Sequence, residues 1–303
     1  MGPLVSARAS PGWRNPDSPL DPGLRLRAGG VVGRVIAGGQ PTIVALHGLG
    51  ASHRYWGRSL DCLAPSATVA TVDLLGFGAS AKPDGDYGID QHLEALAAFL
   101  TSHAAEGPLV LIGHSFGSLL AGAAAHRWPD RVAGVIACSL PAYPSPDVAR
   151  NHLSSLNPMA WLWLRAPRVA HIVCALTRGG GPLTRALAPL AAPGLPRPVA
   201  RDGLLHTWDS YHGSLETLIH QASLRSWLAE SPRTVVLQGS EDVTSPLVLL
   251  REALDGLAVP VRIVVGAGHN LPLERPDVVL RAVRAMVASV SAPGEPPRPE
   301  PGG

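Results

Sequence analysis

The sequence predicts an α/β fold, in which helices cover a parallel sheet. Short runs of apolar and often β-branched residues recur along the chain and are apolar on both faces, which is typical of strands buried in a parallel sheet. Helix-like stretches separate these runs, and several begin at an aspartate or a proline, residues that favour the first turn of a helix. The alternation of the two kinds of element is the pattern of an α/β sheet.

Turn residues bound the predicted strands. Gly29 and Gly30 separate the first two runs and predict a hairpin, the β-branched fourth run ends at Asp73, and the fifth ends at Gly113. The predicted strands are residues 24–28, 31–37, 42–46, 68–72, 109–112, 132–138, 234–237 and 261–265, and the predicted helices are residues 90–103, 118–127, 215–228, 246–254 and 276–289.

A long interval without strands predicts an inserted unit. No strand-like run occurs from Pro141 to Pro232, an interval too long for an ordinary loop. We therefore expect a helical cap at residues 141–212, inserted in a core formed by residues 23–140 and 213–290. The cap has a glycine-rich hinge at residues 179–181. Residues 1–22 and 291–303 are rich in Pro, Gly and Ser and are predicted to be mobile tails, since they can bury little apolar surface.

Composition excludes several classes of protein. The 303 residues suit one large domain or two small ones, and 46% hydrophobic with 16% charged residues excludes a wholly disordered chain. The net charge of +2 gives no electrostatic reason to expect nucleic-acid binding. Residues 1–22 lack the apolar segment of a secretory signal, and prolines and arginines interrupt the apolar stretch 153–176. We therefore expect no stable membrane insertion and a cytoplasmic location.

The motif Gly113-His114-Ser115-Phe116-Gly117 is the strongest chemical signal. It lies between a predicted buried strand and a predicted helix of small residues, the context in which such a serine is held on a sharp turn with its hydroxyl above the sheet. The residues two before and two after the serine crowd each other on this turn, so glycine fits at both positions. Ser115 is therefore the candidate nucleophile.

A serine hydroxyl needs a base, and the base needs a group that orients it. His269 follows the last apolar run in a loop of small residues and is the candidate base. Asp242 follows the run at 234–237 and is the candidate acid, with Glu241 as its rival. His114 is adjacent to Ser115, but neighbouring side chains diverge on the turn. Five further histidines have no such placement and are predicted to be structural or solvated: His53, His92, His103, His126 and His152.

Backbone N–H groups are expected to stabilise the oxyanion that forms when a serine attacks a carbonyl. Phe116, directly after the candidate nucleophile, supplies one, and Leu49, in the glycine-rich loop after the third predicted strand, is the candidate for the other. The segment 73–80 has a Gly-x-Gly pattern but lacks the third glycine of a dinucleotide fingerprint and the lysine of a P-loop, so it is predicted to be a structural turn.

Neither a metal nor a cofactor is expected. The three cysteines, Cys62, Cys138 and Cys174, are far apart in the sequence and form neither a disulfide framework nor a zinc pattern.

With these motifs placed, the chain resembles the α/β-hydrolase superfamily from about residue 24 to residue 289, and in particular its capped serine esterases and haloperoxidase-like members. The matching motifs are L-H-G-L-G at 46–50, D-L-L-G-F-G-A-S at 73–80, G-H-S-F-G at 113–117, Q-G-S-E-D at 238–242 and G-A-G-H at 266–269. The resemblance implies a mostly parallel, eight-stranded sheet with a cap after the sixth strand. It also implies Ser115 as nucleophile, His269 as general base and Asp242 as its orienting acid.

The expected activity is hydrolysis of a carboxylic ester of a small, largely apolar acyl substrate through an acyl-enzyme. The tryptophans and leucines of the predicted cap either line an apolar pocket or form the core of the cap. Several alternatives use the same residues: thioesterase, lactonase, acyltransferase, carbon–carbon bond hydrolase and perhydrolase. A protein of this fold that binds a small molecule without turnover is an alternative of a different class. The sequence makes no prediction of the oligomeric state.

Overall fold

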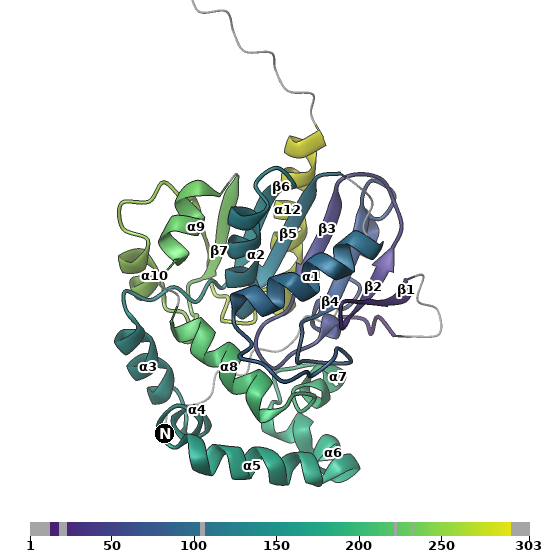
Figure 1. Ribbon diagram of the computed structural model, residues 1–303. Coiled ribbons are helices and arrows are strands. Elements are labelled where there is room, and N and C mark those ends of the chain that lie inside the picture. The colour runs from purple at the N-terminus through teal and green to yellow at the C-terminus, as the bar shows by residue number, and fades with distance from the viewer. Residues whose placement is uncertain (1–12, 18–22, 104–106, 221–222, 232, 292–303) are drawn as a thin grey trace, which may run out of the picture.

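The computed structural model describes residues 13–17, 23–103, 107–220, 223–231 and 233–291, and it confirms the predicted α/β fold (Figure 1). A single eight-stranded sheet forms the centre of the described chain, with helices on both faces. The strands are β1 (Leu24–Ala28), β2 (Val31–Ile36), β3 (Thr42–Leu46), β4 (Thr68–Asp73), β5 (Leu109–His114), β6 (Val132–Cys138), β7 (Thr234–Gly239) and β8 (Val261–Val264).

The strand order places a crevice at one edge of the sheet. The order is β1-β2-β4-β3-β5-β6-β7-β8, with antiparallel pairing of β1 with β2 and of β2 with β4, and parallel pairing from β4 through β8. From β3 the chain runs outward to β4 on one side and returns to β5 on the other. The loops that leave the carboxyl ends of β3 and β5 therefore diverge, and ligands of open α/β sheets bind at such a reversal.

Alternate residues of the central strands pack into two hydrophobic cores, one on each face of the sheet. In β3, Val44 and Leu46 contact one core, and Ile43 and Ala45 contact the other. This alternation explains why the runs are apolar throughout. The helices of the first face are α1 (Ile89–His103), α2 (Phe116–Arg127), α9 (Leu224–Glu230) and α10 (Leu247–Ala253), and those of the second are α11 (Leu271–Glu274) and α12 (Pro276–Ser291).

Helices occupy the interval in which no strand was predicted, and all of them except α9 lie at one end of the sheet (Figure 1). We call α3 to α7 the cap. Ser145 and Asn157 begin its first two helices, since each side chain accepts a backbone N–H and a proline follows each cap residue. In addition to α9, the helices of the interval are α3 (Pro146–Ser155), α4 (Pro158–Arg165), α5 (Pro167–Gly179), α6 (Gly181–Ala191), α7 (Arg197–Asp202) and α8 (Trp208–Ile219).

The single helix predicted at residues 215–228 is wrong. Two helices take its place, because α8 begins at Trp208 and ends at Ile219, and α9 begins at Leu224. The early start has a local cause: the Thr207 side chain accepts from the N–H of Ser210, whose hydroxyl accepts from the N–H of Thr207. The division of the chain into core and cap at residues 141 and 212 stays a prediction.

Part of the N-terminal segment that was predicted to be mobile packs on the core. The indole N–H of Trp13 donates to the carbonyl of Arg54 at 3.2 Å, and Asp17 forms ion pairs with Arg54 and His53. The other residues of the two predicted tails, 1–12, 18–22 and 292–303, lie outside the described residues. Among the helices of the described chain, none is both long enough and apolar enough to cross a membrane.

Candidate active site

Ser115 lies on the sharp turn between β5 and α2, at the centre of the sheet. Its backbone has φ 50° and ψ −119°, a conformation that a residue with a side chain rarely adopts. The turn is fixed on both sides, since the N–H of Ser115 donates to the carbonyl of Cys138 at 2.9 Å and its own carbonyl accepts from the N–H of Ser118 at 2.8 Å. The predicted strained turn is therefore present.

The two glycines of the motif are required by close backbone contacts. A Cβ atom on Gly113 would collide with the carbonyl oxygen of Gly117. A Cβ atom on Gly117 would collide with the carbonyl oxygens of Leu46 and His47, which follow one another at the end of β3. The glycines thus allow α2 to start directly beside the loop that leaves β3.

The structure brings the three candidate residues Ser115, His269 and Asp242 together in a chain of contacts. The Nε2 atom of His269 lies 3.1 Å from the Oγ atom of Ser115. Its Nδ1 atom lies 3.0 Å from Oδ2 and 3.1 Å from Oδ1 of Asp242. These contacts fit an Nδ1–H that donates to the carboxylate and an Nε2 lone pair that accepts from the serine hydroxyl. Glu241, the predicted rival of Asp242, is exposed to solvent.

Asp242 is a buried carboxylate with a full set of donors. Its Oδ1 atom accepts from the backbone N–H groups of Thr244 at 2.9 Å and Ser245 at 2.8 Å, and Oδ2 accepts from the side-chain amide of Gln238 at 2.9 Å. Burial raises the pKa of Asp242, but the charge of His269 and the hydrogen bonds from His269 and Ser245 lower it below its ordinary value. The carboxylate is therefore ionised at neutral pH and fixed in position.

His114 contacts the backbone of His269. It lies next to Ser115 in the sequence, but its Nε2 atom is 2.9 Å from the carbonyl oxygen of His269, to which the Nε2–H donates. The imidazole stacks on the ring of Tyr55 with centroids 4.5 Å apart. Burial and the charge of His269 lower the pKa of His114 to about 3. His114 is thus a neutral hydrogen-bond donor, and its contacts differ from those of a base for Ser115.

The candidate oxyanion donors, Leu49 and Phe116, belong to the two segments that meet at Ser115. Phe116 is the first residue of α2, where a helix leaves its N–H groups without intrahelical acceptors. Leu49 lies in the loop after β3, which passes so close that a Cβ atom on Gly48 would lie 3.3 Å from the Cβ of Ser115. Within the described residues no acceptor is present for the N–H of Leu49 or of Phe116, which leaves both N–H groups available to a substrate.

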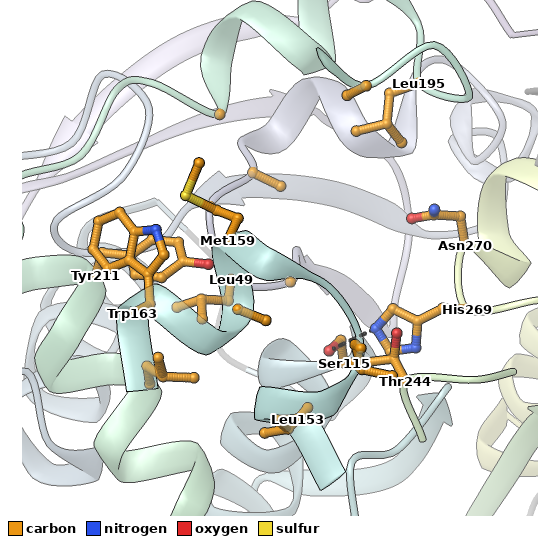
Figure 2. A pocket seen from close by; sticks show the side chains of 18 of the residues that line it. Leu49, Ser115, Leu153, Met159, Trp163, Leu195, Tyr211, Thr244, His269 and Asn270 are labelled. Carbon is orange, nitrogen blue, oxygen red and sulfur yellow. Dashed lines mark hydrogen bonds between the residues drawn. The ribbon is translucent and has the colours of Figure 1, made fainter. Parts of the chain in front are cut away.

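A cavity of about 420 Å³ opens beside Ser115 and His269, between the core and the cap. Figure 2 shows Ser115 and His269 at one end of the cavity and the rings of Trp163 and Tyr211 at the other, with Leu49 between them. The remaining lining is mostly leucine, alanine and glycine. Among the described residues that line it there is no Asp, Glu, Lys or Arg, so the cavity fits an uncharged, apolar group.

The three tryptophans of the predicted cap, residues 141–212, divide among three environments. Trp163 lines the cavity, and its ring stacks on that of Trp208, with centroids 5.1 Å apart. Trp208 is partly buried at the start of α8. Trp161 is 54% exposed on α4. The sequence left open whether these residues line a pocket or form the cap core; of the three, Trp163 lines the cavity and packs against the hydrophobic core of the first face.

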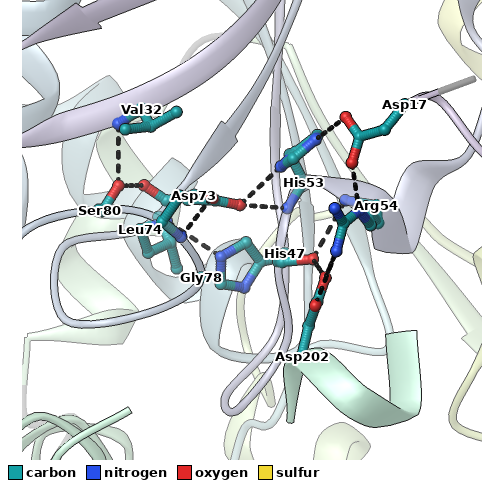
Figure 3. Close-up of polar contacts among 12 residues, drawn as sticks. Asp17, Val32, His47, His53, Arg54, Asp73, Leu74, Gly78, Ser80 and Asp202 are labelled. Carbon is teal, nitrogen blue, oxygen red and sulfur yellow. Dashed lines mark hydrogen bonds and ion pairs between the residues drawn. The ribbon is translucent and has the colours of Figure 1, made fainter. Parts of the chain in front are cut away.

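A buried polar network holds the loop that follows β3 in place (Figure 3). The Nε2 atom of His47 accepts from the N–H of Leu74 at 2.9 Å, and burial lowers the pKa of His47 to about 4. Asp73, at the end of β4, accepts from the N–H groups of His53 and Ala79. The segment 73–80 is therefore a turn organised around the Asp73 side chain, as its motif predicted.

His53, Arg54 and three aspartates form a chain of ion pairs from the core to the cap. His53 lies between Asp73 at 2.8 Å and Asp17 at 3.2 Å, and Arg54 pairs with Asp17 and with Asp202 of α7 (Figure 3). Burial lowers the pKa of His53, but its hydrogen bonds to Asp17 and Asp73 and the charges of both raise it to about 9. Burial raises the pKa of Asp73, and His53 lowers it to about 2. His53 is therefore structural, as expected, and is charged at neutral pH.

The other histidines that were set aside have partners away from Ser115. His92 is buried with its Nε2 atom 3.1 Å from the hydroxyl of Ser214. The remaining three contact the carbonyl of Arg27 (His103), the carboxylate of Glu230 (His126) and the carbonyl of Val243 (His152). Across the described ranges, no group of three or more His, Cys, Asp or Glu side chains could bind a metal ion.

Two features of the site escaped the sequence analysis. The side chain of Gln238 donates to Asp242; Gln238 is the first residue of the Q-G-S-E-D motif at the end of β7, but the motif assigned it no role. The stack of Tyr55 on His114 had no sequence signal, because the two residues lie on separate elements, and the Tyr55 hydroxyl also donates to the side-chain oxygen of Asn270 at 3.3 Å.

Comparison with known proteins identifies relatives of the same fold. The model of the Alpha/beta hydrolase family matches residues 43–282. The chain is 23% identical over 264 residues to the 2-(acetamidomethylene)succinate hydrolase of Mesorhizobium japonicum, a match that covers 82% of this chain and 89% of that protein. The solved structure of a thermophilic esterase from Thermogutta terrifontis superposes with a TM-score of 0.66 at 21% identity, covering 89% of this chain and all of that one.

Other relatives match over a shorter segment. The chain is 35% identical over 102 residues to the 1-acylglycerol-3-phosphate O-acyltransferase of Arabidopsis thaliana. This match covers 32% of the chain and only 24% of the acyltransferase. The similarity is thus confined to a minor part of that relative.

Proposed function

Because the chain belongs to the alpha/beta hydrolase family, and is thus an enzyme of that class, we propose that it is a serine hydrolase of esters with a neutral, apolar acyl group. The observation that supports this proposal is the chain of contacts from Ser115 through His269 to the buried Asp242, at the end of an uncharged cavity. The acyl group occupies the cavity, and its carbonyl carbon lies next to the serine hydroxyl.

The proposed reaction has two halves. Ser115 attacks the ester carbonyl while Nε2 of His269 takes the hydroxyl proton, and Asp242 stabilises the imidazolium that forms. The N–H groups of Leu49 and Phe116 donate to the oxyanion. The imidazolium then returns the proton to the leaving alcohol, which leaves an acyl group on Ser115. In the second half, His269 activates a water molecule that attacks the acyl-enzyme and releases the acid.

The lining of the cavity supports a neutral acyl group. The name of the Mesorhizobium relative describes a substrate derived from succinate, a dicarboxylic acid. In the part of the chain that the structure describes, no arginine or lysine lines the cavity to pair with a carboxylate. A charged group without a partner is costly to transfer from water into an apolar site. We therefore propose that this chain accepts a neutral acyl group, whereas the name of that relative describes a substrate derived from a dicarboxylic acid.

A graded series of p-nitrophenyl esters, with wild type and Ser115→Ala, tests the reaction. We expect wild type to hydrolyse esters with acyl chains that fit the cavity, and Ser115→Ala to lose about 10⁴-fold or more in kcat. A fluorophosphonate probe should label the wild type at Ser115 and leave the variant unlabelled. A folded wild type that neither hydrolyses esters nor reacts with the probe would refute the proposal and favour a binding protein.

A matched pair of substrates tests the charge preference. The p-nitrophenyl esters of butyric acid and of succinic acid have acyl chains of equal length, and the second ends in a carboxylate. We expect kcat/KM for the succinate ester to be lower than for the butyrate ester by about 100-fold or more, because the carboxylate loses its hydration in the cavity without gaining a cationic partner. Equal values for the two esters would contradict the assignment of a neutral acyl group.

A further inference from the structure

The cap presents an unusual amount of apolar surface to solvent. Eight of the thirteen large hydrophobic side chains that are exposed in the described residues belong to α4, α5 and α6. These helices lie on the side of the molecule away from the sheet (Figure 1). We call this surface the apolar cap face, and it consists of Met159, Trp161, Val169, Ile172, Leu176, Leu183, Leu187 and Leu190.

The spacing of these residues shows that they form stripes along the helices. In α5 they occur at 169, 172 and 176, and in α6 at 183, 187 and 190, so each set lies along one side of its helix. The inner side of α5 is separately buried through Ala170 and Cys174. The outer stripes are therefore additional to what the cap needs for its own packing, and large exposed apolar patches mark interaction sites.

The charge of the same segment is one-sided. Residues 148–201, which contain α4, α5 and α6, include seven arginines and no aspartate or glutamate; the two acidic residues of the cap, Asp147 and Asp202, flank this range. In the whole chain basic residues exceed acidic ones only by 25 to 23, so the positive charge is concentrated in this segment. Of its arginines, Arg165, Arg168, Arg185, Arg197 and Arg201 are exposed.

The apolar cap face continues into the cavity. Met159 is 54% exposed and also lines the cavity beside Ser115. Its neighbour Ala160 and the more distant Trp163 line the same wall. A molecule that leaves a hydrophobic phase at this face would therefore reach the cavity wall directly.

We propose that the cap docks on the surface of an anionic lipid bilayer, with the apolar cap face inserted at the level of the headgroups and the arginines paired with lipid phosphates. Helices with apolar residues on one side and arginines nearby bind such surfaces without crossing them, and tryptophan favours the interface. A second copy of the chain is a poorer partner. In a symmetric dimer the same surface faces itself, so arginines would meet arginines with no acidic residue in the segment to pair with them.

Flotation with lipid vesicles measures the docking independently of catalysis. The full chain with Ser115→Ala is mixed with phosphatidylcholine vesicles that contain about 30% phosphatidylglycerol, and with vesicles of phosphatidylcholine alone. We expect binding to the anionic vesicles, at least about tenfold weaker binding to the neutral ones, and a loss of binding in about 0.5 M salt. Equal binding to both vesicles, or none to either, would overturn the proposal.

Two pairs of variants locate the docking surface. Ile172→Ser with Leu187→Ser removes apolar contacts and should weaken binding by about tenfold per residue. Arg168→Gln with Arg185→Gln should weaken it by about fivefold per residue. The controls outside the cap are Val248→Ser with Val265→Ser, which are 68% and 79% exposed in the parent, and the exposed pair Arg251→Gln with Arg262→Gln.

The controls should bind vesicles like the parent, and every variant should retain its thermal unfolding temperature. If the control pairs weaken binding as much as the cap pairs, the cap is not the docking surface. Sedimentation velocity tests whether a second copy of the chain is the partner instead. If the chain does not bind vesicles and forms a dimer that the pair Ile172→Ser with Leu187→Ser dissociates, the partner of the apolar cap face is a second chain and not a lipid surface. Absence of ester hydrolysis by the wild type would refute the proposed reaction and leave this test unaffected, because the vesicle test uses Ser115→Ala and measures no catalysis.

Discussion

The Nε2 atom of His269 lies 3.1 Å from the Oγ atom of Ser115, although 154 positions separate the two residues in the chain. The sheet produces this proximity. Ser115 directly follows β5, and His269 lies in the loop that follows β8, at the same edge of a parallel array of strands. The contact is the basis of the proposed reaction, and it leads to predictions that can be measured on single variants.

The identity of the orienting acid is testable with a neighbouring control. Asp242→Asn keeps the size of the side chain but replaces the carboxylate that accepts from Nδ1 of His269. We expect kcat to fall by about 10⁴-fold, because the imidazole loses its favoured tautomer and the imidazolium loses its counter-charge. Glu241→Gln, at the adjacent exposed residue, should retain the kcat of the wild type. Steady-state kinetics on one ester compares the two, and a larger loss for Glu241→Gln would reverse the assignment.

The two glycines of α2 should differ in their tolerance of a methyl group. In Gly117→Ala the new Cβ would collide with the carbonyls of Leu46 and His47, which cannot rotate away. We expect the free energy of unfolding to fall by about 3 kcal/mol or more. In Gly122→Ala the Cβ would lie 4.0 Å from Leu228, an ordinary contact, so stability should stay constant or rise by up to about 1 kcal/mol. Urea denaturation of both variants checks the contrast.

The charge of His53 should make stability depend on alkaline pH. Its pKa rises from 6.5 to about 9 on folding, so the proton stabilises the folded state below pH 6.5 and the gain is lost as the pH rises through 9. The shift corresponds to about 3 kcal/mol. We expect His53→Gln to be less stable than wild type by about this amount at pH 6, and by much less at pH 10. Thermal or urea unfolding across this range measures it, and a constant difference would contradict the prediction.

Trp163 should limit the length of the acyl chain. It lies at the end of the cavity away from Ser115 (Figure 2). Trp163→Ala would lengthen the cavity, and we expect kcat/KM for esters longer than the preferred one to rise by about tenfold relative to butyrate. Trp161→Ala is the matched control, since Trp161 is 54% exposed and does not line the cavity. If Trp161→Ala changes the chain-length preference and Trp163→Ala does not, the assignment of Trp163 as the residue that limits the acyl chain is wrong.

Local signals in the sequence were sufficient for the fold and for the positions of the candidate site. Gly113 and Gly117, two residues before and two residues after Ser115, predicted a sharp turn. The turn is present, and Ser115 has a positive φ. The apolar runs located the strands to within one or two residues. Their carboxyl ends then placed Asp242 and His269 near Ser115, since parallel strands end along one edge of a sheet. The roles of these residues, and of Leu49 and Phe116, stay predictions.

The sequence by itself determined the α/β class, the positions along the chain at which the strands end and the candidate chemistry, because buried strands and tight turns impose short-range patterns on the chain. Only the tertiary structure decided the stack of Tyr55 on His114, the ion pairs that join Asp17 to the cap through Arg54, and the size of the cavity. These features depend on contacts between distant segments, for which a single sequence has no periodic signal. The exposed side of the cap helices was also decided by the tertiary structure. These helices have apolar residues on both sides, so the sequence does not show which side is buried.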